Sequence, residues 1–142
     1  MKKIFFAAMP AVVALFMVSC GSDSAVPDHQ TMAAKAAPPT GEAIYKTTCV
    51  ACHQANGEGL PGTYPPLAKS DYMTDKNVVI KQVLKGSSGE ITVNGQKYNN
   101  TMPPQQLSDD DMAAVLTYVY SNFGNSGPAV TAAEVKAVRA AL

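Results

Sequence analysis

Two cysteines and a histidine lie together in the sequence Cys-Val-Ala-Cys-His, at Cys49, Cys52 and His53. Two thiols three positions apart on a helical turn can reach the two vinyl groups along one edge of a porphyrin. The histidine that follows is then carried beneath the iron, and a neutral imidazole is a good axial ligand for haem iron. The motif therefore predicts one covalently attached haem c, with the cysteines as thioether links and His53 as an iron ligand.

Three other kinds of site use the same residue types. A zinc site needs four Cys, His or acidic ligands, and the remaining Cys20 and His29 lie upstream, away from any second cluster. A thioredoxin-like Cys-x-x-Cys is expected within a βαβ unit, whereas the flanking pattern here is helical. A structural disulfide between Cys49 and Cys52 would leave His53 unexplained. Haem attachment accounts for all three residues of the motif.

A second iron ligand must be a methionine, because His29 is the only other histidine and lies in a polar segment. Downstream of the motif the candidates are Met73, Met102 and Met112. Met112 lies in a strongly helical pattern, and Met73 lies in a short segment where it is expected to pack. Met102 is followed by two prolines, which fix φ and exclude a regular helix, so a stiff backbone presents its thioether. Ligation by His53 and Met102 leaves no open iron position, which favours electron transfer.

Helices are predicted at both ends of the domain from their capping residues. Thr40 can cap a helix that begins near Gly41 and delivers the two cysteines. Ser108 can cap a later helix whose first turn holds three aspartates, which complement the helix dipole. Thr131 and Glu134 form the pattern of a capping box that opens a last helix. That last helix lies outside the minimum needed to hold a haem.

The intervening sequence predicts a loop, a helix and one hairpin. Residues 54–62 are rich in turn formers and are expected to wrap the haem edge. Thr74 or Asp75 caps an apolar helix that Gly86 ends. Asn94-Gly95 stands between β-prone residues, which is the strongest local signal for a type I′ turn. The resulting hairpin leads into the segment that carries the candidate methionine ligand.

Residues 1–19 are typical of a bacterial secretory signal peptide, with two lysines before an uncharged run of 15 residues from Ile4 to Val18. That run is shorter than the about 20 apolar residues that span a membrane. Met17-Val18-Ser19-Cys20 resembles a lipoprotein box, in which the cysteine becomes the lipidated first residue. We therefore expect a lipid anchor on Cys20 at the periplasmic side of the bacterial cell envelope. The alternatives are an ordinary signal peptide with an incidental cysteine and an uncleaved anchor.

Residues 20–40 are predicted to form a lipidated flexible linker. They are small, polar or proline, so they cannot bury enough apolar surface to offset the entropy of ordering. A flexible chain of this length has a root-mean-square span of about 25 Å. Such a tether would hold a domain near the membrane while letting it turn toward partners, and His29 and Met32 would be solvated bystanders.

From Gly41 to about Gly124 the chain resembles the class I cytochrome c family. Besides the haem motif, Gly41 and Tyr45 have the spacing of a small residue and an aromatic on that family's first helix. Val115 and Tyr118 fit the positions on the last helix that cross it. The resemblance therefore implies a close approach of two helices at Gly41, which has no side chain.

The resemblance also implies roles for residues around the iron. Tyr64-Pro-Pro-Leu67 resembles the segment whose proline carbonyl accepts a hydrogen bond from the ligand imidazole. Pro65 is the best fit for that carbonyl, and Leu67 is expected to pack on the haem. In that family a tryptophan contacts a haem propionate. This chain has no tryptophan, so Tyr72 or Tyr98 would have to make that contact instead.

The stretch from Val93 to Pro104 resembles cytochrome c subunits or domains that serve periplasmic dehydrogenases and copper nitrite reductases. The implied fold is a small all-α cytochrome c fold around a covalent haem, with one short β-hairpin. Residues 41–124 would form the cytochrome c domain, and residues 125–142 a C-terminal extension helix. The implied function is one-electron transfer by a membrane-tethered monohaem carrier that is not itself an enzyme.

Two alternatives to a free carrier stay open. The first is a dedicated electron-transfer subunit of a periplasmic dehydrogenase, oxidase or nitrite reductase complex. The second is a haem sensor or peroxidase-like protein, which would need an open iron position. We expect a monomer whose redox partner proteins dock near the exposed haem edge. From Gly41 onward the chain has seven lysines and one arginine against nine acidic residues, a net charge of −1. This charge argues against non-specific nucleic-acid binding, which needs a basic surface.

Overall fold

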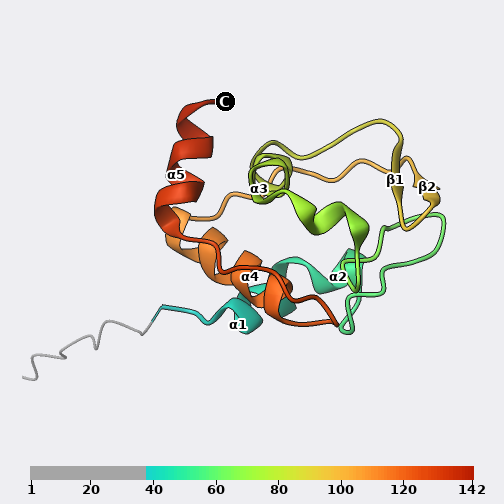
Figure 1. Ribbon diagram of the computed structural model, residues 1–142, viewed down its shortest axis with the longest axis horizontal. Helices are drawn as coiled ribbons and strands as arrows, with labels where there is room; N and C mark the ends of the chain where they lie inside the picture. The colour runs from blue at the N-terminus through green and yellow to red at the C-terminus, as the bar shows by residue number, and fades with distance from the viewer. Residues whose placement is uncertain (1–37) are drawn as a thin grey trace, which may run out of the picture. The chain divides into compact units, whose positions relative to one another are not determined.

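Helices dominate the part of the chain that the computed structural model describes, residues 38–142 (Figure 1). In chain order the elements are α1 (Gly41–Thr48), α2 (Val50–His53), the 3-10 turn η1 (Asp71–Thr74), α3 (Lys76–Lys85), β1 (Ile91–Val93), β2 (Gln96–Tyr98), α4 (Asp109–Ser121) and α5 (Ala132–Ala140). The two strands pair antiparallel in a single hairpin. This confirms the predicted helical fold with one short hairpin.

The capping residues determine where the helices begin. The Thr40 hydroxyl accepts a hydrogen bond from the backbone N–H of Ala43 at 3.2 Å, and Ser108 accepts one from Asp111 at 3.1 Å. Of the two candidates before α3, Asp75 is the cap, because its carboxylate accepts from the first turn of the helix. Each cap satisfies N–H groups that lack a partner within the helix. The predicted helix starts are therefore confirmed.

Helices α1 and α4 cross in close contact (Figure 1). At the crossing, a Cβ atom on Gly41 would collide with the Ala114 carbonyl oxygen and lie 2.9 Å from the Tyr118 Cβ. Tyr45 is buried beside this point, and its ring packs against Tyr118 and Phe123 with centroid distances of 5.6 and 5.0 Å. The close approach expected at Gly41 is confirmed, and it leaves no room for a side chain.

Replacing Gly41 with alanine should destabilise the domain. Alanine is the better helix former, so local propensity alone predicts a gain, whereas overpacking against a backbone carbonyl costs about 1–3 kcal/mol. We expect the second effect to prevail, because the obstructing atom belongs to α4 itself and cannot rotate away. Chemical denaturation of the wild type and of Gly41→Ala measures the difference. A gain in the free energy of unfolding would show that the helices can separate at no cost.

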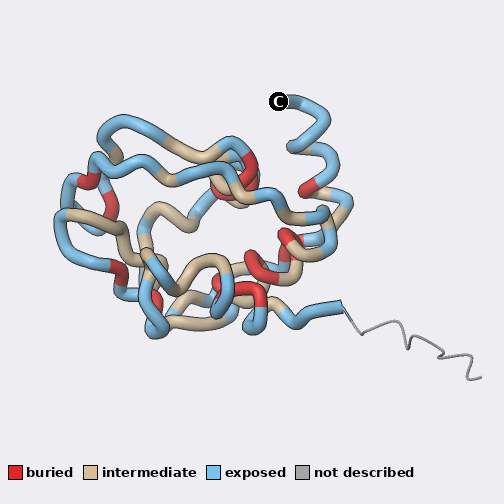
Figure 2. The backbone as a smooth tube through the Cα atoms, turned by 180° about the vertical axis from the view of Figure 1, so that it is seen from behind, coloured by how far each residue is buried: buried red, intermediate tan, exposed pale blue. Residues whose placement is uncertain are grey.

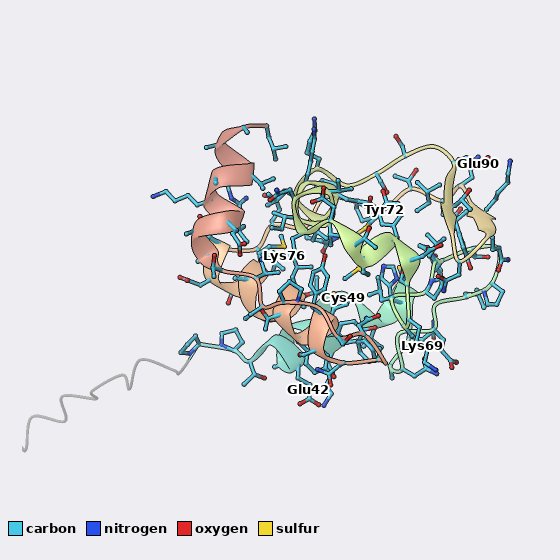
Figure 3. The ribbon with its side chains drawn as sticks, viewed as in Figure 1. Glu42, Cys49, Lys69, Tyr72, Lys76 and Glu90 are labelled. Atoms are coloured by element: carbon cyan, nitrogen blue, oxygen red, sulfur yellow. The ribbon has the colours of Figure 1, made fainter. Side chains whose placement is uncertain are left out.

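Helix α5 packs against α3 and α4 through one deeply buried residue and two ion pairs. Val135 is fully buried, while most of the helix is exposed (Figure 2). Arg139 Nε lies 2.8 Å from the Asp109 carboxylate at the start of α4. Lys76, labelled in Figure 3, is the first residue of α3, and its Nζ pairs with the Glu134 carboxylate of α5 at 2.5 Å. The last helix is therefore attached to the start of both neighbouring helices.

The carboxylate of Glu134 is held in its charged form by two neighbours. Besides Lys76, the backbone N–H and the hydroxyl of Thr131 donate to it at 2.8 and 2.9 Å, which completes the predicted capping box. The hydrogen bond from Lys76, followed by those from Thr131, lowers the pKa of Glu134 to about 2. Because the folded pKa is depressed, the stabilisation is complete above the ordinary value of 4.5 and is lost as the pH falls toward 2.

Glu134→Gln should make the free energy of unfolding less dependent on pH on the acid side. The wild type is expected to lose stability relative to the variant as the pH falls from about 4.5 to about 2, because only the wild type must take up a proton at this site. Chemical denaturation at a series of pH values measures the two slopes. Parallel slopes would show that Glu134 titrates alike in the folded and unfolded chains.

None of the helices within residues 38–142 is long and apolar enough to cross a membrane. The predicted signal peptide, Cys20, His29 and nearly all of the linker lie outside the described residues.

Candidate functional site

An apolar cavity in the described part of the chain brings together the residues singled out for haem chemistry. Cys49, Cys52 and His53 line it from the turn at α2, and Met102 lines it from the segment after β2. Pro65 and Leu67 also line it. Helices α3 and α4 and the hairpin complete the wall. Figure 3 labels Cys49 at this turn, below α3 in the view. Of the predicted site residues, Cys20 alone lies outside the described part of the chain.

The two cysteines are placed on one side of a helical turn. Cys49 ends α1 and caps α2, and its carbonyl oxygen accepts from the backbone N–H groups of Cys52 and His53 at 3.2 and 2.9 Å. Both thiols are free, with no disulfide between them. Burial, followed by the nearby Cys52, raises the pKa of the Cys49 thiol to about 11. The turn therefore carries two free thiols at the edge of an apolar cavity, the arrangement expected for thioether attachment.

The imidazole of His53 is oriented by a single hydrogen bond. Its Nδ1 lies 3.0 Å from the Pro65 carbonyl oxygen, which can only accept, so Nδ1 carries the proton and Nε2 keeps a free lone pair. Burial lowers the pKa of His53, and the bond to Pro65 opposes that shift only in part. A neutral ring with a free Nε2 is the form that binds a metal. The contact between His53 and Pro65 that the family resemblance implied is present.

A glycine behind Pro65 makes this contact possible. Gly59 has a φ of +64°, and a Cβ atom there would lie 2.6 Å from the Pro65 carbonyl oxygen and would also collide with the Tyr64 carbonyl. The N–H of Gly59 donates to the His53 carbonyl oxygen at 3.0 Å. Sequence reasoning identified this glycine only as one of several turn formers. The signal that pointed to it was the density of glycines in residues 54–62.

Met102 is held by backbone contacts with the end of α3. Its N–H donates to the Ser87 carbonyl, and its carbonyl accepts from the Ser87 N–H, each at 2.9 Å. Three residues on, the Gln105 N–H donates to the Val83 carbonyl at 2.9 Å. Gly86 has a φ of +73°, and a Cβ atom there would collide with the Met102 carbonyl oxygen. Sequence reasoning identified Gly86 as a helix stop and missed its second role beside Met102.

The three candidate methionines differ in their surroundings. Met112 is completely buried in the core between helices and does not line the cavity. Met73, in η1, does line it, together with Met102. Met102 differs from Met73 because two hydrogen bonds clamp its backbone to a neighbouring segment. The cavity therefore holds two thioethers, and the backbone around Met102 is the more firmly placed.

The cavity wall suits a large apolar ring. Lysine, arginine, aspartate and glutamate are all missing from its lining, which is mostly aliphatic, aromatic or proline. Both tyrosines proposed for a propionate contact reach the wall: Tyr72 donates to Gln82 at 2.7 Å, and Tyr98 to Gln96 at 3.2 Å. Within residues 38–142 no three His, Cys, Asp or Glu residues cluster as metal ligands. These residues fit a covalent haem.

Comparisons with known proteins agree with this geometry. Residues 39–123 match the family model for cytochrome c. The chain is 38% identical over 111 residues to cytochrome c-552 of Thermus thermophilus, covering 70% of this chain and 84% of that protein. It is 34% identical over 107 residues to the fructose dehydrogenase cytochrome subunit of Gluconobacter japonicus, and the match covers 70% of this chain and 22% of that protein. It is 28% identical over 103 residues to the alcohol dehydrogenase (quinone) cytochrome c subunit of Gluconobacter oxydans, again covering 22%.

Proposed function

The chain belongs to the cytochrome c family, and from this premise we propose that it is a membrane-tethered one-electron carrier with His53 and Met102 as iron ligands. As a cytochrome c domain it carries a covalent haem c and transfers electrons without being catalytic itself. The bound haem supplies an iron that alternates between the ferric and ferrous states. The chain's own residues attach the ring, orient the ligands and keep water away.

The observation that carries the proposal is the meeting of His53 and Met102 in one uncharged cavity. The Pro65 carbonyl keeps the ring of His53 in the tautomer that can bind a metal. Cys49 and Cys52 provide the thioether links on the same turn, and the Leu67 side chain contributes to the apolar wall. With two ligands held throughout, the coordination changes little between oxidation states, which suits electron transfer.

Binding of carbon monoxide separates this function from a haem sensor or peroxidase-like protein. A carrier with two permanent protein ligands has no open position, so the reduced protein at neutral pH should not bind carbon monoxide within minutes. Difference spectra before and after addition of the gas measure this. Immediate stoichiometric binding would contradict six-coordinate ligation and favour a sensor or peroxidase-like function.

The membrane tether is proposed from the leader alone. Cleavage before Cys20 and acylation of that residue would leave the linker of residues 20–40 between the membrane and the domain of residues 41–124. A single acyl chain binds membranes only weakly and reversibly, so durable anchoring needs several chains. Mass spectrometry of the mature protein tests this, with Cys20→Ser as the soluble control. A mature protein with an unmodified Cys20 thiol would show that the leader serves only for export to the periplasm.

A second candidate function is suggested by the relatives. Two of them are cytochrome subunits of dehydrogenases, so this chain could serve as the electron-transfer subunit of a dehydrogenase, oxidase or nitrite reductase complex. We propose instead a monomer that meets its redox partners transiently at the exposed haem edge, through the small interface typical of such encounters. Mild detergent extraction followed by size-exclusion chromatography distinguishes the two. Co-elution with a second subunit in constant ratio would favour the complex.

A further inference from the structure

The segment that carries Met102 has little regular structure of its own. Between the end of β2 and the start of α4 the chain forms only the isolated bridge to Ser87. Pro103 and Pro104 have no N–H to donate. The position of the methionine therefore depends on the few contacts that this segment makes with other elements. Its hydrogen bonds to other elements come from the end of α3 and from α5, and Leu107 also packs against the core.

The first set of contacts joins the methionine itself to the turn after α3. Ser87 exchanges two backbone hydrogen bonds with Met102. The approach is so close that Gly86 has no space for a Cβ atom, which would also lie 2.8 Å from the Pro104 nitrogen. Only glycine at this position allows both the φ of +73° and the close contact.

The second set of contacts comes from the last helix, which lies beyond the residues that match the family model. Arg139 Nη2 donates to the Leu107 carbonyl at 2.8 Å, and Arg139 Nε donates to the Asp109 carboxylate at 2.8 Å. Leu107 lines the cavity and ends the methionine segment. The helix that bears Arg139 is itself anchored by Val135 in the core and by the pair between Lys76 and Glu134. One arginine thus joins this anchored helix to the end of the segment.

We propose that Gly86, Ser87 and Arg139 form a two-ended clamp that keeps the Met102 thioether on the iron. Gly86 and Ser87 hold the segment at Met102, and Arg139 holds it near its end, at Leu107. The clamp acts by making local opening of the segment less favourable. This inference rests on the proposed function, in which Met102 is an iron ligand. It gives the C-terminal helix a role as a brace for an iron ligand and makes all three members positioning residues.

The rate at which the reduced protein binds carbon monoxide measures how often the thioether leaves the iron. For Gly86→Ala the matched control is Gly95→Ala, because Gly95 has a similar φ of +76° but nothing within 4 Å of its Cβ position. Both variants place a side chain at a positive φ, and only Gly86→Ala also brings that side chain against Met102. We expect Gly86→Ala to bind carbon monoxide about tenfold faster than its control, equivalent to about 1.4 kcal/mol of easier opening. Equal rates would overturn the role of Gly86.

For the other end of the clamp, Arg139→Ala is compared with Lys136→Ala on the same helix. Both residues are exposed, and Val135 keeps α5 in the core in either variant, so the two variants differ in the loss of the Arg139 contacts with Leu107 and Asp109. We expect the rate for Arg139→Ala to rise a few-fold, with a weaker far-red thioether–iron band in the oxidised protein, and the rate for Lys136→Ala to stay at the wild-type value. An unchanged rate and band in Arg139→Ala would overturn the role of the last helix. Failure of the proposed function looks different, because the wild type itself would then lack the band.

Discussion

Replacing Met102 with leucine will abolish the far-red charge-transfer band of the oxidised protein and lower its midpoint potential. The thioether stabilises the reduced iron relative to harder ligands, so losing it favours the oxidised form. Axial ligand identity spans about 0.8 V in haem proteins, and we expect a fall on the order of 0.2 V. Leucine keeps nearly the volume of methionine, so the apolar wall stays filled. Visible spectra and a spectroelectrochemical titration measure both effects.

The matched control is Met73→Leu. Met73 lines the same cavity, and Met73→Leu makes the same change of side chain as Met102→Leu. The backbone of Met73, however, lies in η1 rather than beside Ser87. We expect this variant to keep the band and a midpoint potential close to that of the wild type. The reduced Met102→Leu protein should also bind carbon monoxide rapidly, because a position on the iron is then open. Loss of the band in Met73→Leu with retention in Met102→Leu would reverse the assignment of the ligand.

Replacing both Cys49 and Cys52 with alanine will leave a chain that does not fold cooperatively. Without thioether links the haem is not retained. The cavity bounded by α3, α4 and the hairpin is then left without the haem that fills it. For a domain of about 100 residues, burial of the chain's own apolar surface gives only a small free energy of unfolding. An empty apolar cavity lowers that free energy further. Far-ultraviolet circular dichroism should show reduced helix content, and heating should show no sharp transition.

Cys20→Ala is the control for this experiment, because it removes a cysteine that lies outside the described domain. It should leave both the haem content and the thermal transition unchanged. A haem-free double variant with a sharp transition and full helix content would show that the protein core of the domain is sufficient for folding. In that case the haem would add function but would not be required for the fold.

Features that depend on near neighbours in the chain were predictable from the sequence. The caps at Thr40 and Ser108 and the capping box at Thr131 bond groups only three residues away. The hairpin follows from Asn94 and Gly95, both of which adopt positive φ. The haem motif is equally local, since one turn of helix is enough to bring two cysteines and a histidine together.

The tertiary structure decided how the ligands are held. Gly59 lies against the Pro65 carbonyl, and Gly86 lies against Met102, yet in the sequence each glycine indicates no more than a turn. Met73 and Met102 both reach the cavity, and only the backbone pairing with Ser87 separates them. Contacts of this kind join segments distant in the sequence, and neither partner carries a local pattern that identifies the other.

The sequence by itself determined the cofactor chemistry and the helical frame of this protein. Both depend on side-chain type and on hydrogen bonds within a turn, which act over three or four residues. Only the tertiary structure brought Arg139 to the Leu107 carbonyl and Ser87 to Met102. The physical reason is that such contacts form after the helices have packed, and the packing depends on many side chains at once.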